Sequence, residues 1–243
     1  MVESIMLGSL YFDGVPQKVG AEYSFEAMSL GNTVPGKEIW WLKLKSGVMI
    51  ADKCVCVNVS WDQLNENHLV FGALAQINGR PYLCRCPKVG SRNYTPNEWD
   101  DLLNEAGIDL STTNWKQAFF WGQETPGTGS KGAAYRVMRG HESPRYWSMY
   151  LSADRFNFFG FRPVLEPLMA VPEDFEPLLG QHVTAMGPGW ENASGILAAY
   201  SDYDLMLKSP APLPDACTWA VPAGKHIIVD RASVSWLRKT ENN

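Results

Sequence analysis

The sequence predicts an α+β protein in two parts: a domain of short strands and short helices over residues 1–172, and a small all-β barrel over residues 174–243. Three observations predict this organisation. Short apolar segments alternate with turn signals from the start of the chain, and two segments carry the signals of a helix N-terminus. A proline-containing stretch, Val171–Glu176, is typical of a linker. After Gly180 the pattern changes to closely spaced short strands, which indicate a small barrel.

Composition narrows the class of protein. The 243 residues are 45% hydrophobic and 19% charged, which excludes wholesale disorder. The net charge of −5 disfavours a general nucleic-acid binder, which needs a basic face. Ten Trp, nine Tyr and ten Phe indicate β-rich packing or a contact surface. Neither a signal peptide nor an apolar run of membrane-spanning length is recognisable, so we expect a cytoplasmic or virion-associated protein with no membrane contact.

The first elements follow from apolar patterns and local turn signals. Ile5–Phe12 is apolar and β-prone, and Lys53–Ser60 alternates as a strand does. Ser60 is a good N-cap for a short helix over Trp61–Asn67. Asn78-Gly79 predicts a hairpin turn before the strand Pro81–Cys86.

A second helix is predicted in the middle of the chain. Thr95 as the cap, Pro96 at the first helical position and Glu98 at the third would make a capping box, for a helix that ends near Ala106. The apolar stretch Trp115–Trp121 fits either a short helix or a strand.

The rest of the first part is a loop followed by two strands. Glu124–Ala133 is rich in Gly, Thr and Ser, which is typical of a surface loop. Tyr135–Gly140 and Gly160–Leu165 have the composition of strands. Between them, His141–Phe159 is rich in aromatic and small polar residues without a clean period.

The second part is predicted to consist of five short strands, interrupted by the proline-rich loop Ser209–Pro214. The strands are expected at Val183–Met186, Gly195–Tyr200, Asp204–Leu207, His226–Val229 and Ala232–Leu237.

The cysteines allow two interpretations. There are five of them, and an odd number in a reducing compartment favours free thiols. Two C-x-C pairs could form a four-thiolate zinc site if each pair lies in a strand with both sulfurs on one face, although the usual zinc spacing is wider. Alternatively, the cysteines are small buried hydrophobic residues of the strands Cys54–Val59 and Tyr82–Cys86. The five are Cys54, Cys56, Cys84, Cys86 and Cys217.

Three segments carry a resemblance to a known fold. Gly79–Trp99 is similar to a "Y-R-L-P-T-E-A-E-W" run, Tyr135–Gly140 to an "R-V-x-R-G" strand and Gly160–Val164 to a "G-F-R" strand. In this order they resemble the formylglycine-generating-enzyme type of the C-type lectin fold. The resemblance implies a compact α+β domain with short helices around a small twisted sheet. It also implies that Arg139 and Arg162 are structural and hold loops by several hydrogen bonds each.

Two branches of this fold are enzymes, and the chain does not match their chemistry. One resembles an oxidase that holds copper with a cysteine pair, but His141–Phe159 contains no cysteine. The other uses three histidines for iron, a cluster that the histidines of this chain do not form in sequence. We therefore expect no catalytic residue, no metal and no cofactor. A formylglycine-generating-type, metal-dependent oxidase is the alternative. The four histidines are His68, His141, His182 and His226.

A third branch, the variable proteins that retroelements diversify in phages and gut bacteria, resembles the chain more closely. Its fixed "R-G-x-x-S-x-R-x-W" run matches Arg139–Trp147, and its fixed "G-F-R-P-x-L-E" strand matches Gly160–Glu166. In that family, mutagenesis at adenines converts Asn codons into codons for Tyr, Ser, Asp, Phe or His. The resemblance implies a variable surface between these segments that recognises an unknown protein or glycan.

The resemblance assigns two sets of residues. Tyr would supply rigid contact area, and Ser, Asn and Asp adaptable hydrogen bonds. Tyr150, Phe156 and Phe158 are expected at the surface, and Phe159 in the core with Trp147 and Phe161; alternatively, these aromatic residues all belong to the core of an ordinary lectin-like domain. The expected ligand contacts are His141, Glu142, Tyr146, Ser148, Tyr150, Ser152, Asp154, Phe156, Asn157 and Phe158, and the expected structural frame is Arg139, Trp147, Arg155, Phe161 and Arg162.

The second part resembles Sm-like barrels. Gly180–Thr184, Gly195–Leu197 and Tyr203–Leu207 are similar to the first motif of that family, and His226–Leu237 to the second. The resemblance implies ring assembly or RNA binding. With seven acidic and five basic side chains in Glu176–Asn243, we expect a homo-oligomer contact rather than RNA binding, and an Sm-like RNA-binding adaptor is the alternative.

Overall fold

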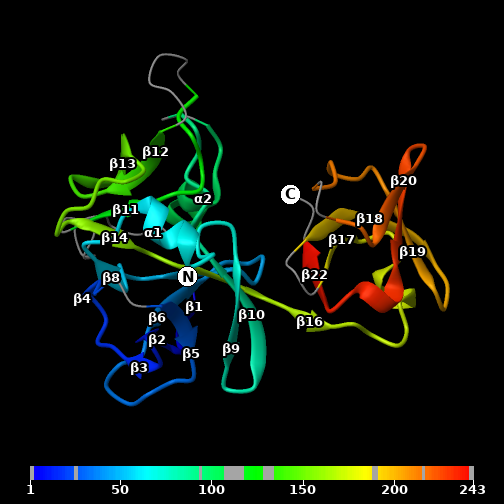
Figure 1. Ribbon diagram of the computed structural model, residues 1–243, viewed down its shortest axis with the longest axis horizontal. Coiled ribbons are helices and arrows are strands. Elements are labelled where there is room, and N and C mark those ends of the chain that lie inside the picture. The colour runs from blue at the N-terminus through cyan, green and yellow to red at the C-terminus, as the bar shows by residue number, and fades with distance from the viewer. Residues whose placement is uncertain are drawn as a thin grey trace. The chain divides into compact units, whose positions relative to one another are not determined.

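The computed structural model shows a mostly β protein with two short α-helices and four sheets in the part of the chain it describes (Figure 1). The described residues are 3–24, 27–92, 95–106, 118–127, 134–187, 191–214 and 217–240. The chain divides into two compact units, Met1–Glu166 and Pro167–Asn243. None of the described helices is long and apolar enough to span a membrane.

The first sheet of the first unit has six strands, and it includes the predicted Asn78-Gly79 hairpin between β9 and β10. Both turn residues have positive φ, 52° and 78°, as a two-residue hairpin turn of this kind requires. The order is β1 (Glu3–Met6), β6 (Trp40–Lys43), β7 (Met49–Ala51), β15 (Val164–Pro167), β10 (Arg80–Arg85) and β9 (Ala73–Ile77).

The second sheet carries most of the residues that the sequence singles out. Its β11–β14 and β4–β8 pairs are parallel, and the remaining pairs are antiparallel. The order is β13 (Ser143–Leu151), β12 (Tyr135–Gly140), β11 (Phe119–Trp121), β14 (Phe159–Phe161), β8 (Cys56–Val57) and β4 (Ala21–Glu22).

Two predicted strands are each divided in the structure. Ile5–Phe12 is broken at Gly8, whose φ of +69° ends β1 and sends β2 into a separate three-stranded sheet. Gly160–Leu165 separates into β14 and β15, which lie in different sheets. The predicted strand Lys53–Ser60 is reduced to β8, because Asn58 has a φ of +61°. The third sheet has the order β3 (Val15–Pro16), β2 (Ser9–Phe12) and β5 (Met28–Gly31).

The first helix has the predicted cap and the second does not. Ser60 caps α1 (Trp61–Glu66) in a capping box with Gln63, as expected. The predicted capping box of Thr95 and Glu98 is wrong. Helix α2 (Glu98–Ala106) begins two residues later than that box requires, and Asn97 Oδ1 accepts from the Asp100 N–H at 2.9 Å. The Glu98 carboxylate binds Arg85 instead, with two contacts of 2.7 Å.

Two buried clusters cover opposite faces of the second sheet, because successive side chains of a strand point to opposite sides. Trp121, Phe159 and Phe161 belong to the larger cluster, which extends to the other sheets of the unit. Phe120 and Trp99 belong to the smaller cluster beside α2. The ring centroids of these last two residues lie 4.6 Å apart.

The second unit is a seven-stranded sheet that includes all five predicted strand regions and two strands that were not predicted, β16 and β20. The ladder runs from β16 to β20 without pairing between its ends among the described residues, so the closed barrel that was predicted is not observed. The strand predicted at Ala232–Leu237 begins only at Trp236, because the 3₁₀ turn η3 (Arg231–Ser233), capped by Asp230, precedes it. The order is β16 (Met169–Ala170), β22 (Trp236–Thr240), β17 (His182–Met186), β18 (Asn192–Tyr200), β19 (Asp204–Lys208), β21 (His226–Asp230) and β20 (Ala220–Ala223).

The division between the units falls earlier than the expected boundary at residues 172–174. Met169 and Ala170 form β16, which pairs with Leu237 and Trp236 of β22. The 3₁₀ turn η2 (Glu176–Leu178) follows, and Phe175 beside it is fully buried in the core of the second unit. The stretch predicted as a linker therefore contributes to the second unit.

Candidate ligand-binding surface

Five of the ten expected ligand contacts gather in one cluster of rings, here called the aromatic patch. Its sixth member comes from β11, which lies in the apolar stretch that the sequence predicts as either a short helix or a strand. The members are Phe119, His141, Tyr146, Tyr150, Phe156 and Phe158.

The other rings of the aromatic patch pack on two buried rings of the second sheet, namely Phe119, which is itself a member of the patch, and Phe159. Phe119 and Phe159 are opposite each other in the parallel β11–β14 pair, so their side chains share a face. The His141 ring stacks on Phe119 with 4.9 Å between centroids, and Tyr150 meets Phe159 edge-on at 4.6 Å. Phe156 also meets Phe159 edge-on, at 5.0 Å. The rings are therefore held by defined packing on the core.

The rings differ in how much they present to solvent. Phe156 is 46% exposed and Tyr146 is 37% exposed. Tyr150 and Phe158 are half-buried, because they pack against the larger core cluster. Of the three aromatic residues expected at the surface, Phe156 is exposed, whereas Tyr150 and Phe158 are half-buried.

The β12–β13 register determines which side chains of β13 face the patch. Ser148 is opposite Met138, and Tyr150 is opposite Arg136 on the same face. Trp147 is opposite Arg139 on the other face, toward α2. Trp147 is half-buried rather than in the core as expected, and its indole N–H donates to the Gly90 carbonyl at 3.2 Å. It is not fully covered because it borders a cavity.

Side chains outside the segment that the sequence singled out extend the patch toward α1. The Arg136 guanidinium lies 4.1 Å from the ring centroid of Trp61. Trp61 meets Phe71 edge-on at 6.0 Å, and Phe71 is 63% exposed. These side chains extend the apolar and aromatic surface beyond the segment that the sequence singled out.

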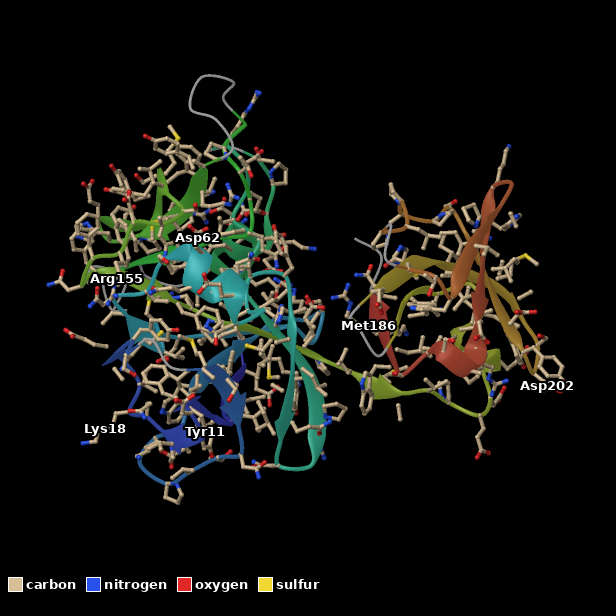
Figure 2. The ribbon with its side chains drawn as sticks, viewed as in Figure 1. Tyr11, Lys18, Asp62, Arg155, Met186 and Asp202 are labelled. Atoms are coloured by element: carbon tan, nitrogen blue, oxygen red, sulfur yellow. The ribbon has the colours of Figure 1, made fainter. Side chains whose placement is uncertain are left out.

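Other expected contacts hold the loop between β13 and β14. Ser152 Oγ donates to the Asp62 carboxylate on α1 at 3.1 Å, and the Asp154 carboxylate accepts from the Leu151 N–H at 3.1 Å. Arg155 Nε donates to Asn58 Oδ1 at 3.2 Å, which fits its expected place in the frame. Figure 2 labels Asp62, which lies on α1, and Arg155, which lies within this loop.

Glu142 and Asn157 are two further expected ligand contacts. Both are exposed, and neither is a member of the aromatic patch.

The Arg139 side chain is buried to 1% exposure and holds three segments together. Its guanidinium donates to the Val89 carbonyl at 2.9 and 3.1 Å, to the Arg145 carbonyl at 2.8 Å and to the Asp100 carboxylate at 3.2 Å. Burial lowers the pKa of Arg139, and the Asp100 charge opposes that change. These contacts fit the structural role that the resemblance implies.

Arg162 is the second buried arginine of the expected frame. Its guanidinium carbon lies 4.8 Å from the ring centroid of Phe120 and 5.1 Å from that of Trp99. Burial lowers the pKa of Arg162, and nearby Cys54 opposes this change. The neighbouring Phe161 is fully buried, as expected.

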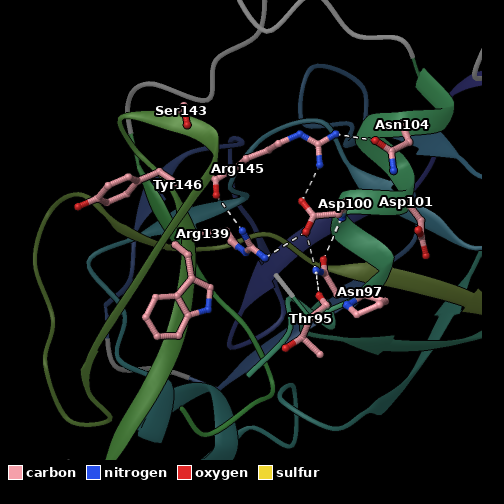
Figure 3. Close-up of a pocket in the computed structure, with 11 residues that line it drawn as sticks. Thr95, Asn97, Asp100, Asp101, Asn104, Arg139, Ser143, Arg145 and Tyr146 are labelled. Carbon is pink, nitrogen blue, oxygen red and sulfur yellow. Dashed lines mark hydrogen bonds and ion pairs between the residues drawn. The ribbon is translucent and has the colours of Figure 1, made fainter. Parts of the chain in front are cut away.

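A cavity of about 600 Å³ lies on the α2 side of β13 (Figure 3). Sequence reasoning missed the α2 side chains that border it, because about forty residues separate α2 from β13. The signal that could have found them is the pair Arg139 and Arg145 in the run that carries the resemblance, since both arginines bind Asp100. The lining residues are Thr95, Pro96, Asn97, Asp100, Asp101, Asn104, Arg139, Ser143, Arg145, Tyr146 and Trp147.

The cysteines do not converge on a metal site. All five are free and buried. The expected common face of a C-x-C pair is wrong for Cys54 and Cys56, which lie in different core clusters because only Cys56 is in a strand. Burial raises the pKa of both thiols. The described residues contain no group of three His, Cys, Asp or Glu side chains that could hold a metal ion.

Comparisons of the chain with protein-family models, with curated proteins and with solved structures found no match.

Proposed function

We propose that this protein recognises a ligand through the aromatic patch, and that the patch is the variable region of a retroelement-diversified protein. One observation carries the proposal. The positions that the sequence marks as variable because of the fixed segments around them include five whose rings meet on one surface of the fold. These positions were chosen only because they lie within or between two resembling segments of the sequence. Such a choice gives their rings no physical reason to meet unless the positions share a surface.

The chemistry of the patch favours a protein as the ligand. Aromatic rings supply large apolar area at low entropic cost and dominate the central contacts of protein interfaces. Exposed Phe156 and the partly exposed Tyr146 would be the first contacts, and Phe71 would extend the contact area. The rings rest on buried Phe119 and Phe159, so little ordering is required on binding.

We propose further that the first unit has the formylglycine-generating-enzyme type of C-type lectin fold. The three resembling segments supply β10 with the start of α2, then β12, then β14, in the expected order. The second unit would serve assembly as an Sm-like module. It has two terminal strands, β16 and β20, and a terminal strand is where another copy can pair.

The DNA that flanks the gene tests the retroelement part of the proposal. We expect a near-copy of the codons for residues 141–159, with Asn codons at the variable positions, beside a reverse-transcriptase gene. Flanking DNA that contains neither feature would contradict the diversification proposal.

A display experiment tests the surface itself. The patch library varies His141, Tyr146, Tyr150, Phe156 and Phe158, and a matched control library varies five exposed positions elsewhere. Both libraries are selected first for folded chains and then for binding to one well-folded test protein. We expect binders from the patch library only, and equal yields from both would contradict the proposal. The matched library varies five exposed positions elsewhere in the first unit, namely Glu3, Ser4, Met6, Val15 and Trp40.

A further inference from the structure

Strand β13 forms one edge of the second sheet, and among the described residues it pairs only with β12 (Figure 1). With nine residues it is the longest terminal strand of the described sheets, whereas β4 at the opposite edge has two. Natural sheets keep such strands short or place charges and prolines in them, because a free edge pairs with other chains. The stretch Tyr146–Leu151 contains no charge, proline or glycine, so this edge lacks the usual protection.

The β12–β13 register determines which backbone groups of β13 face away from the sheet. In β12, the Val137 N–H donates to the Glu124 carbonyl at 3.0 Å, and the Val137 carbonyl accepts from the Gly122 N–H at 2.9 Å, both on the side of β11. Met149 is opposite Val137, so the N–H and C=O groups of Met149 point to the outer edge. The same holds for Trp147, two residues earlier. In the described part of the chain, none of these four outward backbone groups has a hydrogen-bond partner.

The unpaired stretch is bounded at both ends by backbone groups that are already bonded. On one side, the Arg145 carbonyl accepts from the Arg139 guanidinium at 2.8 Å. On the other side, the Leu151 N–H donates to the Asp154 carboxylate at 3.1 Å, and the Leu151 carbonyl accepts from the Asp154 N–H at 2.9 Å. Between them, one N–H and one C=O group face outward at every second residue, about 7 Å apart along the strand. Another extended backbone presents donors and acceptors with this same period.

We infer that the ligand of the aromatic patch lays an extended polypeptide segment along this edge and adds one strand to the second sheet. The backbone of that segment would bond to the outward groups of Trp147 and Met149. Its side chains would alternate, so that those opposite Ser148 and Tyr150 lie on the face of the patch. The choice of occupant rests on the proposed function, because the edge and the patch share β13.

Backbone pairing would give this site an affinity that does not depend on which side chains it carries. The bonds at Trp147 and Met149 require only an extended partner, whereas the expected contacts Ser148 and Tyr150 discriminate between partners by their side chains. The edge would thus hold many different protein ligands in one common orientation.

Random linear peptides, selected by ribosome display on the whole protein, supply the probes. In the complex with a selected peptide, amide hydrogen exchange of Trp147 and Met149 should slow at least about tenfold, because both N–H groups become donors in the new ladder. Met149→Pro should weaken peptide binding at least about tenfold, because it removes an outward N–H and leaves the β12 ladder intact. Met149→Ala is the matched control, since it truncates the same side chain but keeps the N–H, and it should bind nearly as the unmodified chain does.

The contrary results are equally specific. The inference is wrong if no linear peptide is enriched, if both amides exchange as fast in the complex as in the free chain, or if Met149→Pro and Met149→Ala bind equally well. It is also wrong if sedimentation shows that the unmodified chain is a dimer and Met149→Pro a monomer, because a second copy then occupies the edge. A thermal melt of each variant confirms that it is folded.

Phe156→Ala separates this inference from the patch proposal, because Phe156 belongs to the patch but lies outside β13. Loss of peptide binding in Phe156→Ala but not in Met149→Pro would support the patch and contradict the strand pairing. Loss in Met149→Pro but not in Phe156→Ala would support the pairing and contradict the role of the patch.

Discussion

Neighbouring rings of the aromatic patch are expected to differ in role. A half-buried ring contributes mainly to the stability of the fold, and an exposed ring mainly to contact with a ligand. Tyr150 is half-buried against Phe119 and Phe159, with centroids 5.7 and 4.6 Å away, whereas Phe156 is 46% exposed. Tyr150→Ala should therefore lower the free energy of unfolding by about 2–3 kcal/mol, less than a full core truncation. Phe156→Ala should lower it by less than about 1 kcal/mol. Urea denaturation of the two variants measures both values, and the reverse order would contradict the assignment of these side chains.

The buried Arg85 makes stability depend on pH through Glu98. Burial alone raises the pKa of Glu98, but the Arg85 charge, its hydrogen bonds and the Lys88 N–H outweigh burial and hold that pKa below its ordinary value of 4.5. A carboxyl group whose pKa is lowered by folding contributes stability above its unfolded pKa, and this contribution is lost as the pH falls through the folded value.

Glu98→Gln should thus destabilise the protein by about 3 kcal/mol at pH 7, because Arg85 loses its bidentate partner. The difference from the unmodified chain should shrink as the pH falls below about 4.5. Urea denaturation at pH 7 and at pH 4 measures the change, and Glu142→Gln is the exposed control. A difference that stays constant or grows at low pH would exclude this ion pair as the cause.

At the scale of elements, the start of α2 depends on one amide side chain. Asn97 Oδ1 accepts from the Asp100 N–H, and Asn97 is buried. Asn97→Ala should cost about 1–2 kcal/mol, whereas Thr95→Ala, at the position that the sequence favours as the cap, should cost only a few tenths. Thermal unfolding of the two variants decides between the caps. An equal loss at both positions would mean that Thr95 also holds the helix.

Local signals in the sequence predicted local structure well. Ser60 and Gln63 lie three residues apart, and the hairpin at Asn78-Gly79 needs only its own two residues. The cap of α2 was predicted at the wrong residue because a partner distant in the sequence, Arg85, binds the glutamate that a capping box requires. The parallel pairing of β11 with β14 joins segments forty residues apart, which no local pattern encodes.

The same difference between local signals and contacts distant in the sequence applies to the candidate site. The stretch from Arg139 to Phe159, which covers the first run that resembles the variable-protein family and the residues before the second, contains five of the six residues of the aromatic patch. Phe119 was missed because its strand is only three residues long, too short to show a period. The α2 side of the cavity was missed because Asp100 and Asn104 appear as an ordinary polar helix surface until Arg145 is seen to bind both.

For the whole molecule, the division between the units determines which fragments should fold. Glu166 ends the first unit, where its carboxylate binds buried Arg85. Residues 168–173 belong to the second unit by their contacts. Met169 and Val171 pack on its core, and Arg231 donates to the Glu173 carbonyl at 2.8 Å.

Fragments cut on either side of this segment test the division. The fragment 168–243 should be more stable than 174–243 by about 3 kcal/mol, because the shorter one loses β16 and two apolar contacts with the core. The fragments 1–167 and 1–173 should be equally stable, because the extra residues find no strand partner without β22. Urea denaturation and amide NMR spectra of the four fragments provide the measurement. If 1–173 proves more stable than 1–167, the segment also supports the first unit, and if 174–243 matches 168–243, then β16 is only an appended strand that the second fold does not need.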